Sequence, residues 1–284
     1  MTTWVFLRGL MREQRHWGRF PADFHREIGD AKIVTLDLPG NGVLYREASP
    51  TRIEEMAQYC REELAARQLA PPYHMLALSL GAMVAVAWCA QHADEIGACV
   101  LINTSLRPFS PFYRRLRPQN YLKLLRSLHT DLKQREQLIL HLTSCHGNAQ
   151  IALADEWVSF QREFPVSRRN VLRQLYAAAR FVAPLRKPQP PILVLGSLQD
   201  RLVDTRCSQS LVHHWHTDSA FHPQAGHDLP LDDGPWVARQ VRTWLESKEI
   251  ARQQARFGSS VTPEVIIDKV PQINLCQKFK HVNR

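Results

Sequence analysis

The sequence predicts an α/β protein whose mostly parallel sheet is covered by helices on both faces and carries a helical insertion. Short, almost entirely apolar runs alternate with segments of helical periodicity, which is typical of parallel strands buried on both faces. The alternation stops between residues 104 and 189, where helical periodicity continues without a strong strand-like run. The 284 residues allow one large domain or two small ones, at about 150 residues per domain.

Five strands are expected. The first ends at Arg8-Gly9, the second stops at Pro39-Gly40-Asn41-Gly42, and the fifth ends at Gly196-Ser197, all residues that favour turns. The expected strands cover residues 4–7, 32–38, 73–78, 98–102 and 191–195.

Helices are expected between and after these strands. Residues 51–68 have helical spacing, with Thr51 as the N-cap and Glu54 three residues later. Residues 81–92 are rich in Ala and Val and indicate a buried helix, and residues 236–247 form an amphipathic helix that closes the body. Within the insertion the helix-like segments are residues 121–128, 133–142, 149–164 and 169–182.

The elements divide the chain into three parts. Residues 1–103 and 190–245 form the core, and residues 104–189 form a helical lid inserted between two strands. Residues 246–284 contain Gly258-Ser259-Ser260 and no clean periodicity. We therefore expect a C-terminal extension there that is disordered in part or lies on the surface.

The formal net charge of +9 is concentrated in the lid. That segment holds 15 Lys and Arg and five Asp and Glu, a net charge of +10, while residues 246–284 add +3 and the remainder carries −4. A basic lid on a slightly acidic body indicates an anionic partner or substrate, and the alternative is a solvated basic surface without a specific partner. Nucleic acid is not the expected partner, because no helix-turn-helix, RNP-type or zinc-finger pattern accompanies the arginines.

Composition excludes further classes. No apolar run approaches the ~20 residues of a membrane-spanning helix, and Arg8 interrupts the N-terminal apolar stretch, so neither a membrane span nor a secretory signal is expected. The six cysteines are irregularly spaced without a C-x-x-C pair, which favours reduced thiols in a cytoplasmic protein. His141 and His146 flank Cys145 without a carboxylate at matching spacing, so no metal site is expected.

Ser79 is the candidate nucleophile. It lies in Ala77-Leu78-Ser79-Leu80-Gly81, directly after an expected strand and directly before an expected helix. A tight strand-to-helix turn lifts such a serine above the edge of the sheet, and small residues two positions before and after let the backbones pack closely. The alternative is a serine that caps a buried helix.

Two further residues complete a predicted catalytic triad with Ser79. Asp200 follows the fifth expected strand, so it lies at the same sheet edge as Ser79, and His227 comes 27 residues later in Gly226-His227. In this chain order His227 is the base that activates Ser79, and Asp200 orients its imidazole.

Other acids and histidines are weaker candidates. Asp204 is a rival acid, but its position before Thr205 predicts the N-cap of the next helix. The other nearby histidines lack the Gly-His context, and the acids after His227 are expected to be loop charges and helix starters. These residues are His213, His214 and His222, and Asp228, Asp232 and Asp233.

The body resembles the α/β-hydrolase fold in the lid-bearing layout of carboxylesterases. The matching motifs are Leu7-Arg8-Gly9-Leu10, Asp37-Leu38-Pro39-Gly40-Asn41-Gly42, Ala77-Leu78-Ser79-Leu80-Gly81, Leu195-Gly196-Ser197-Leu198-Gln199-Asp200 and Ala225-Gly226-His227. The resemblance implies an oxyanion hole made by the backbone N–H groups of Leu80 and Leu10. Family members usually carry His-Gly where this chain has Arg8-Gly9, and a backbone donor survives that change. Ala77 in place of the usual glycine is also tolerable.

The expected function is hydrolysis of a carboxylic ester or thioester through an acyl-enzyme, without a cofactor. The layout is similar to that of pimeloyl-carrier-protein methyl ester carboxylesterases, which implies docking of an acidic acyl-carrier protein by the lid. The candidate docking residues are Arg114, Arg115, Arg117, Lys123 and Arg126. Two alternatives stay open: lid arginines that clamp a small carboxylated metabolite in a lyase or hydrolase of the same fold, and a catalytically idle scaffold that binds a partner.

Overall fold

The computed structural model describes residues 1–127, 129–145 and 150–257. The chain separates into two compact units, Met1–Leu245 and Glu246–Arg284. In the second unit the described residues are helical. Much of the predicted C-terminal extension lies outside the described residues.

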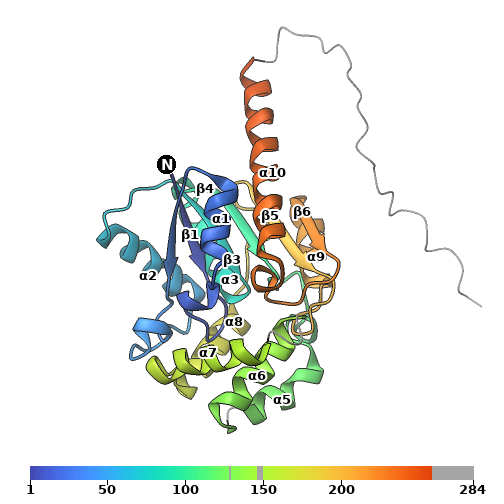
Figure 1. Cartoon of the computed structure of the whole chain (residues 1–284). Helices are drawn as coiled ribbons and strands as arrows, with labels where there is room; N and C mark the ends of the chain where they lie inside the picture. The colour runs from blue at the N-terminus through green and yellow to red at the C-terminus, as the bar shows by residue number, and fades with distance from the viewer. Residues whose placement is uncertain (128, 146–149, 258–284) are drawn as a thin grey trace, which may run out of the picture. The chain divides into compact units, whose positions relative to one another are not determined.

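Six strands form one sheet in which every neighbouring pair is parallel, in the order β2-β1-β3-β4-β5-β6 (Figure 1). The five predicted strands are confirmed. Their bounds and that of the sixth are β1 Thr2–Leu7, β2 Ala31–Leu36, β3 Tyr73–Leu78, β4 Ile96–Ile102, β5 Ile192–Ser197 and β6 Asp218–His222. The strand β6 was not predicted, because this edge strand is polar and its side chains are exposed or half-buried.

Helices cover both faces of the sheet. Alternate residues of β1 face opposite ways: Val5 packs in a cluster with residues of α2, α3 and α9, whereas Phe6 packs with residues of α1 and α10. This period of two places apolar side chains in both layers, which is why the strands are almost continuously apolar. The covering helices are α1 Phe20–Ile28, α2 Ile53–Ala66, α3 Leu80–Gln91, α9 Arg206–Trp215 and α10 Leu229–Phe257.

Two of these helices differ from their predicted ends. Thr51 does not cap α2: the N-cap position is Arg52, and no side chain makes a cap hydrogen bond there. The helix predicted at residues 236–247 lies inside the longer α10, which is interrupted by non-helical torsions at Asp233 and contains Pro235. Proline cannot donate the backbone hydrogen bond, so a break at this point is expected.

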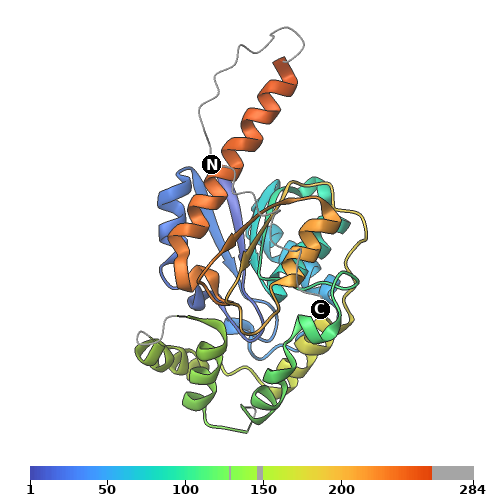
Figure 2. The same ribbon diagram turned by 90° about the vertical axis from the view of Figure 1, so that its right-hand side faces the viewer.

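The insertion between β4 and β5 is helical, as predicted. Its helices are α4 Phe112–Arg115, α5 Tyr121–Ser127, α6 Leu132–Thr143, α7 Gln150–Glu163 and α8 Arg168–Arg180. They gather at one end of the sheet, near the carboxyl ends of the strands (Figures 1 and 2). A single bridge between Arg107 and Val182 brings the two ends of the insertion together. Two predicted end residues, Leu128 and Ala149, lie outside the described residues.

Membrane-spanning helices, metal-binding clusters and cysteine thiols were checked within the described residues. In that part of the chain, no helix is both long and apolar enough to cross a bilayer. The same residues contain no cluster of three or more His, Cys, Asp or Glu side chains able to hold a metal ion. Cys60, Cys89, Cys99 and Cys207 are buried free thiols, and Cys145 is a half-buried free thiol.

Candidate active site

Ser79 occupies the junction between β3 and α3. Its φ is 56° and its ψ is −112°, a left-handed conformation that is uncommon for a residue with a Cβ and that concentrates at functional sites. Its backbone N–H donates to the carbonyl oxygen of Ile102 at 2.9 Å, which ties the turn to β4. A Cβ on Gly81 would lie 2.5 Å from the carbonyl oxygen of Leu7 and 2.6 Å from that of Arg8. Close packing against the end of β1 therefore requires glycine at this position.

Asp200 and His227 are joined in the interior. The Asp200 Oδ2 atom lies 2.7 Å from His227 Nδ1, and its Oδ1 atom accepts the backbone N–H groups of Leu202 and Val203, each at 2.8 Å. Both side chains are buried. Burial disfavours the charged imidazole, but the Asp200 carboxylate outweighs this effect and raises the pKa of His227. The contact leaves Nε2 as the ring nitrogen available to a neighbouring group.

The rival residues have other partners. Asp204 pairs with Arg206 at 2.6 Å, and this hydrogen-bonded cation lowers the pKa of Asp204 to about 2. The N-cap of α9 is Thr205 and not Asp204 as predicted, although the Asp204 carboxylate still accepts the backbone N–H of Arg206. His222 Nε2 lies 3.2 Å from a carboxylate oxygen of Asp233.

Two cavities meet at Ser79. The smaller, of about 120 Å³, is lined by both Ser79 and His227, so the predicted nucleophile and base face the same space. The larger, of about 820 Å³, extends from Ser79 and Leu80 to residues at the start of the insertion. This cavity is large enough for an organic substrate and reaches Ser79.

Leu10 and Leu80, whose backbone N–H groups are the predicted oxyanion donors, both line these cavities. Leu10 lines both cavities and Leu80 lines the larger one. Within the described chain neither N–H donates a hydrogen bond. The next residue, Met11, donates its N–H to Gln174 Oε1 of α8 at 3.1 Å, which holds the loop after β1 in place.

Arg8 forms a buried ion pair that its sequence context did not predict. Its Nη1 and Nη2 atoms donate to the two carboxylate oxygens of Asp228 at 3.0 and 2.5 Å, and its guanidinium lies 4.7 Å from the centre of the Trp17 ring. Asp228 was expected to be a loop charge, but it is 3% exposed and directly follows His227. Its backbone N–H donates to the carbonyl oxygen of Thr143 at the end of α6. The only sequence signal for this pair was Arg8 itself, which stands where the resemblance to α/β-hydrolases implies histidine.

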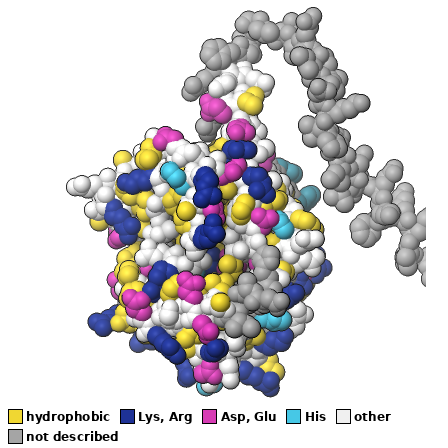
Figure 3. All heavy atoms as spheres, viewed as in Figure 1, with side chains coloured by type: hydrophobic (Ala, Val, Ile, Leu, Met, Phe, Trp, Pro, Cys, Tyr) yellow, Lys and Arg dark blue, Asp and Glu magenta, His cyan; other side chains and the backbone are white. Residues whose placement is uncertain are grey.

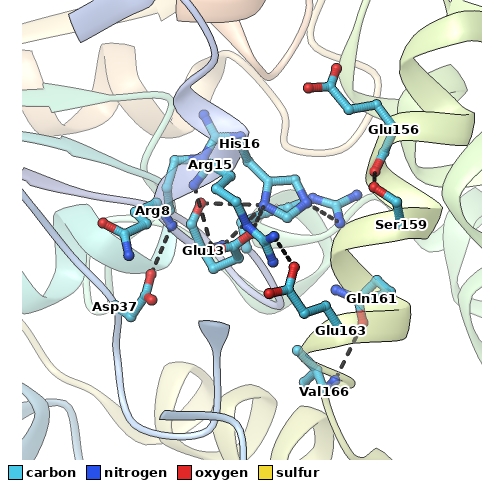
Figure 4. A network of polar contacts seen from close by, with 12 residues as sticks. Arg8, Glu13, Arg15, His16, Asp37, Glu156, Ser159, Gln161, Glu163 and Val166 are labelled. Carbon is cyan, nitrogen blue, oxygen red and sulfur yellow. Dashed lines mark hydrogen bonds and ion pairs between the residues drawn. The ribbon is translucent and has the colours of Figure 1, made fainter. Parts of the chain in front are cut away.

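The loop after β1 also contacts α7 through charged side chains (Figure 4). Arg15 reaches Glu13 at 2.6 Å and Glu163 of α7 at 2.5 Å. The N–H of Gln14 donates to Asp37 at 2.7 Å, and burial raises the pKa of that carboxyl to about 6. These contacts connect the loop that carries Leu10 to Asp37, which directly follows β2, and to the insertion.

The five candidate docking residues do not form one exposed surface. Arg114, Arg115 and Arg117 are half-buried, and Arg115 Nη2 donates to the carbonyl oxygen of Ala178 at 2.6 Å. Lys123 and Arg126 on α5 are exposed. Figure 3 shows Lys and Arg side chains over the lower part of the molecular face, with Asp and Glu among them.

Comparison with known proteins places this fold in a family. A family profile described as "Alpha/beta hydrolase family" matches residues 4–240. The chain belongs to the alpha/beta hydrolase family. A search of curated proteins finds no match.

Solved structures share the fold at low sequence identity. The chain is similar to a serine hydrolase from Cycloclasticus zankles (15% identity, 87% of this chain and 91% of that chain, TM-score 0.71). It is also similar to a thermophilic esterase from Thermogutta terrifontis (18%, 87% and 90%, TM-score 0.65). A third is a Mycobacterium tuberculosis protein whose name proposes non-heme bromoperoxidase activity (19%, 87% and 91%, TM-score 0.67). These names cover more than one chemistry, so the reaction has to be argued from the site.

Proposed function

We propose that the protein is a serine hydrolase that cleaves a carboxylic ester or thioester through an acyl-enzyme. The observation that carries this proposal is the buried Asp200–His227 hydrogen bond at a cavity that Ser79 also lines. A serine hydroxyl is a weak nucleophile until a neighbouring base removes its proton. The left-handed backbone of Ser79 supports the same role, because such torsions concentrate at functional sites.

Each step uses groups of this chain and water. His227 Nε2 takes the proton of the Ser79 hydroxyl while the oxygen attacks the substrate carbonyl carbon, and the N–H groups of Leu10 and Leu80 stabilise the oxyanion. The protonated imidazole then gives its proton to the leaving alcohol or thiol, which produces the acyl-enzyme. Water activated by His227 releases the acid and restores Ser79.

The insertion serves as a lid in this proposal. Residues from its start, such as Phe112 and Arg115, and from α8, such as Leu175, line the larger cavity together with Ser79. A lid of this kind sequesters the substrate and selects it by shape and charge.

We also propose that an acidic acyl-carrier protein docks on the lid and delivers the substrate. Exposed Lys123 and Arg126 on α5 support it, and the exposed Leu122 and Leu125 on the same helix add apolar contact area. Such docking would occur in the cytoplasm. We expect the KM for a carrier-bound ester to rise with ionic strength, and a KM that is insensitive to salt would contradict this candidate.

Ester hydrolysis by matched variants tests the proposed reaction. Wild type and Ser79→Ala are compared on 4-nitrophenyl esters from acetate to decanoate, with Ser159→Ala as control because Ser159 is an exposed serine on α7. We expect Ser79→Ala to lose at least about 10³-fold in kcat and to lose labelling by a fluorophosphonate, while Ser159→Ala keeps both. Equal hydrolysis or labelling of wild type and Ser79→Ala would exclude the proposal.

A further inference from the structure

The larger cavity is apolar along most of its wall and cationic at one part. Among its 17 lining residues, Arg107 and Arg115 carry charge, and neither Asp nor Glu lines it. Leu175, Leu202 and Phe112 belong to the apolar wall. The cavity therefore combines space for an apolar chain with two guanidinium groups and no opposite charge.

The positive charge of Arg115 is only partly satisfied by hydrogen-bond acceptors. It donates to the carbonyl oxygens of Ala178 at 2.6 Å and Ala179 at 3.5 Å, in the last turn of α8. These bonds satisfy part of the helix end, but its buried Nε atom has no hydrogen-bond partner. Burial and the nearby cation of Arg107 lower the pKa of Arg115. Hydrogen bonds to the end of α8 thus use only some of the N–H donors of the Arg115 guanidinium.

Neither cavity arginine has a carboxylate partner. Within the described residues, no Asp or Glu oxygen lies within 4.0 Å of a side-chain nitrogen of Arg107 or Arg115. The arginines on the loop after β1 differ, since Arg8 pairs with Asp228 and Arg12 pairs with Glu136. Arg107 is exposed and Arg115 is half-buried. A carboxylate or phosphate of a ligand in the shared cavity would supply the anionic partner that both guanidinium groups lack.

We propose that Arg107 and Arg115 form a subsite for an anionic group of the substrate. This inference rests on the proposed hydrolase function and names its substrate class: an ester whose apolar chain carries a carboxylate or a phosphate away from the scissile carbonyl. Guanidinium groups suit both anions, because their N–H donors match the oxygen geometry. The apolar wall binds the chain between the reacting carbonyl at Ser79 and the anion.

Paired ester substrates test the subsite. The neutral substrate is 4-nitrophenyl octanoate, and the anionic one is the mono-4-nitrophenyl ester of suberic acid, which has the same chain length and a terminal carboxylate. We expect wild type to favour the anionic ester in kcat/KM by about tenfold or more, the usual effect of hydrogen bonds to a charged group. Arg107→Gln and Arg115→Gln should each reduce this ratio at least severalfold.

Controls separate recognition from folding. Arg162→Gln removes an exposed arginine on α7 and should leave the ratio unchanged. Because Arg115 also bonds to α8, the rate on the neutral ester reports whether its replacement has damaged the site, and Arg107→Gln leaves those bonds intact. A wild-type enzyme that hydrolyses both esters equally, or a ratio unchanged in both arginine variants, would overturn the subsite and leave the hydrolase proposal standing.

A binding measurement separates the subsite from the reaction. Calorimetry on Ser79→Ala compares octanoate, octyl phosphate and 1-octanol, since none of them requires hydrolysis. We expect an anion to bind at least about tenfold more tightly than the alcohol, and to lose that advantage in Ser79→Ala/Arg107→Gln; the tighter of the two anions identifies the preferred group. Equal binding of all three compounds would refute the subsite, whereas anion binding without any ester hydrolysis would refute the proposed function alone.

Discussion

Replacement of Arg8 by glutamine should destabilise the protein far more than replacement of both Arg8 and Asp228 by neutral residues. The two side chains are 2% and 3% exposed and form a bidentate ion pair. Arg8→Gln leaves the Asp228 carboxylate buried beside His227 without its cation. In the double variant Arg8→Gln/Asp228→Asn, no uncompensated charge remains.

The size of the effect follows from burial. Breaking a buried pair from one side costs about 3–5 kcal/mol, whereas replacing both partners by neutral groups is often nearly neutral. For a protein of this size each kcal/mol changes the melting temperature by about 2–4 °C. Arg8→Gln should therefore lower the melting temperature by about 6–20 °C, and the double variant should recover most of that loss.

Thermal and urea denaturation at pH 7 measure these differences. The control is Lys133→Gln, because Lys133 forms an exposed pair with Asp155, with 53% and 56% of the side chains exposed, and such pairs contribute about 1 kcal/mol or less. If Arg8→Gln melts within about 2 °C of wild type, or if the double variant is no more stable than Arg8→Gln, the buried pair does not have the assigned role.

Three further predictions concern the turn, the base and a buried acid. Gly81→Ala should lower the free energy of unfolding by about 1–3 kcal/mol, because the added methyl group overpacks against the end of β1. The control Ala85→Gly in the same helix should lose only ~1 kcal/mol. Equal losses in urea denaturation would contradict the close approach. The kcat of ester hydrolysis should rise with pH through the pKa of His227, which lies above its ordinary value. Asp228→Asn should move the midpoint of this rise to lower pH, because the Asp200 and Asp228 carboxylates raise the pKa of His227 and Arg8 lowers it. An unmoved midpoint would show that Asp228 has no effect on the pKa of His227. Because folding raises the pKa of Asp37 from 3.8 to about 6, its stabilising effect is complete below about pH 4 and is lost as pH rises to about 6. Wild type should then lose about 3 kcal/mol that Asp37→Asn does not lose, and parallel pH profiles would refute this assignment.

The insertion is joined to the rest of the chain by contacts that would have to break if it moved as a lid. Gln174 of α8 donates to Asn41 at 2.9 Å and to Ser49 at 3.0 Å, and its carbonyl oxygen accepts from Met11. At the end of α6, Ser144 donates to Asp232 at 2.6 Å. Buried polar networks of this kind favour a single arrangement. These anchors are consistent with the proposal that the shape and charge of the larger cavity select the substrate.

The sequence by itself determined the sheet, its two covering layers and the candidate triad. Apolar runs and turn residues are local signals, and they located five of the six strands. The positions of Ser79, Asp200 and His227 followed from chain order, because the carboxyl ends of parallel strands meet at one edge of the sheet. The strand that was missed, β6, lacks such a signal because it is polar and partly exposed.

Only the tertiary structure decided how the charged residues are used. Arg8 meets Asp228 across 220 positions of the chain, and no periodicity or spacing links two such residues. Arg115 was expected on an exposed docking surface, yet it donates to the carbonyl oxygen of Ala178 in α8 and lines a cavity together with Arg107. Local sequence reports which residues are charged. Whether a charge is solvated, paired or left without a partner depends on which distant segments exclude water around it.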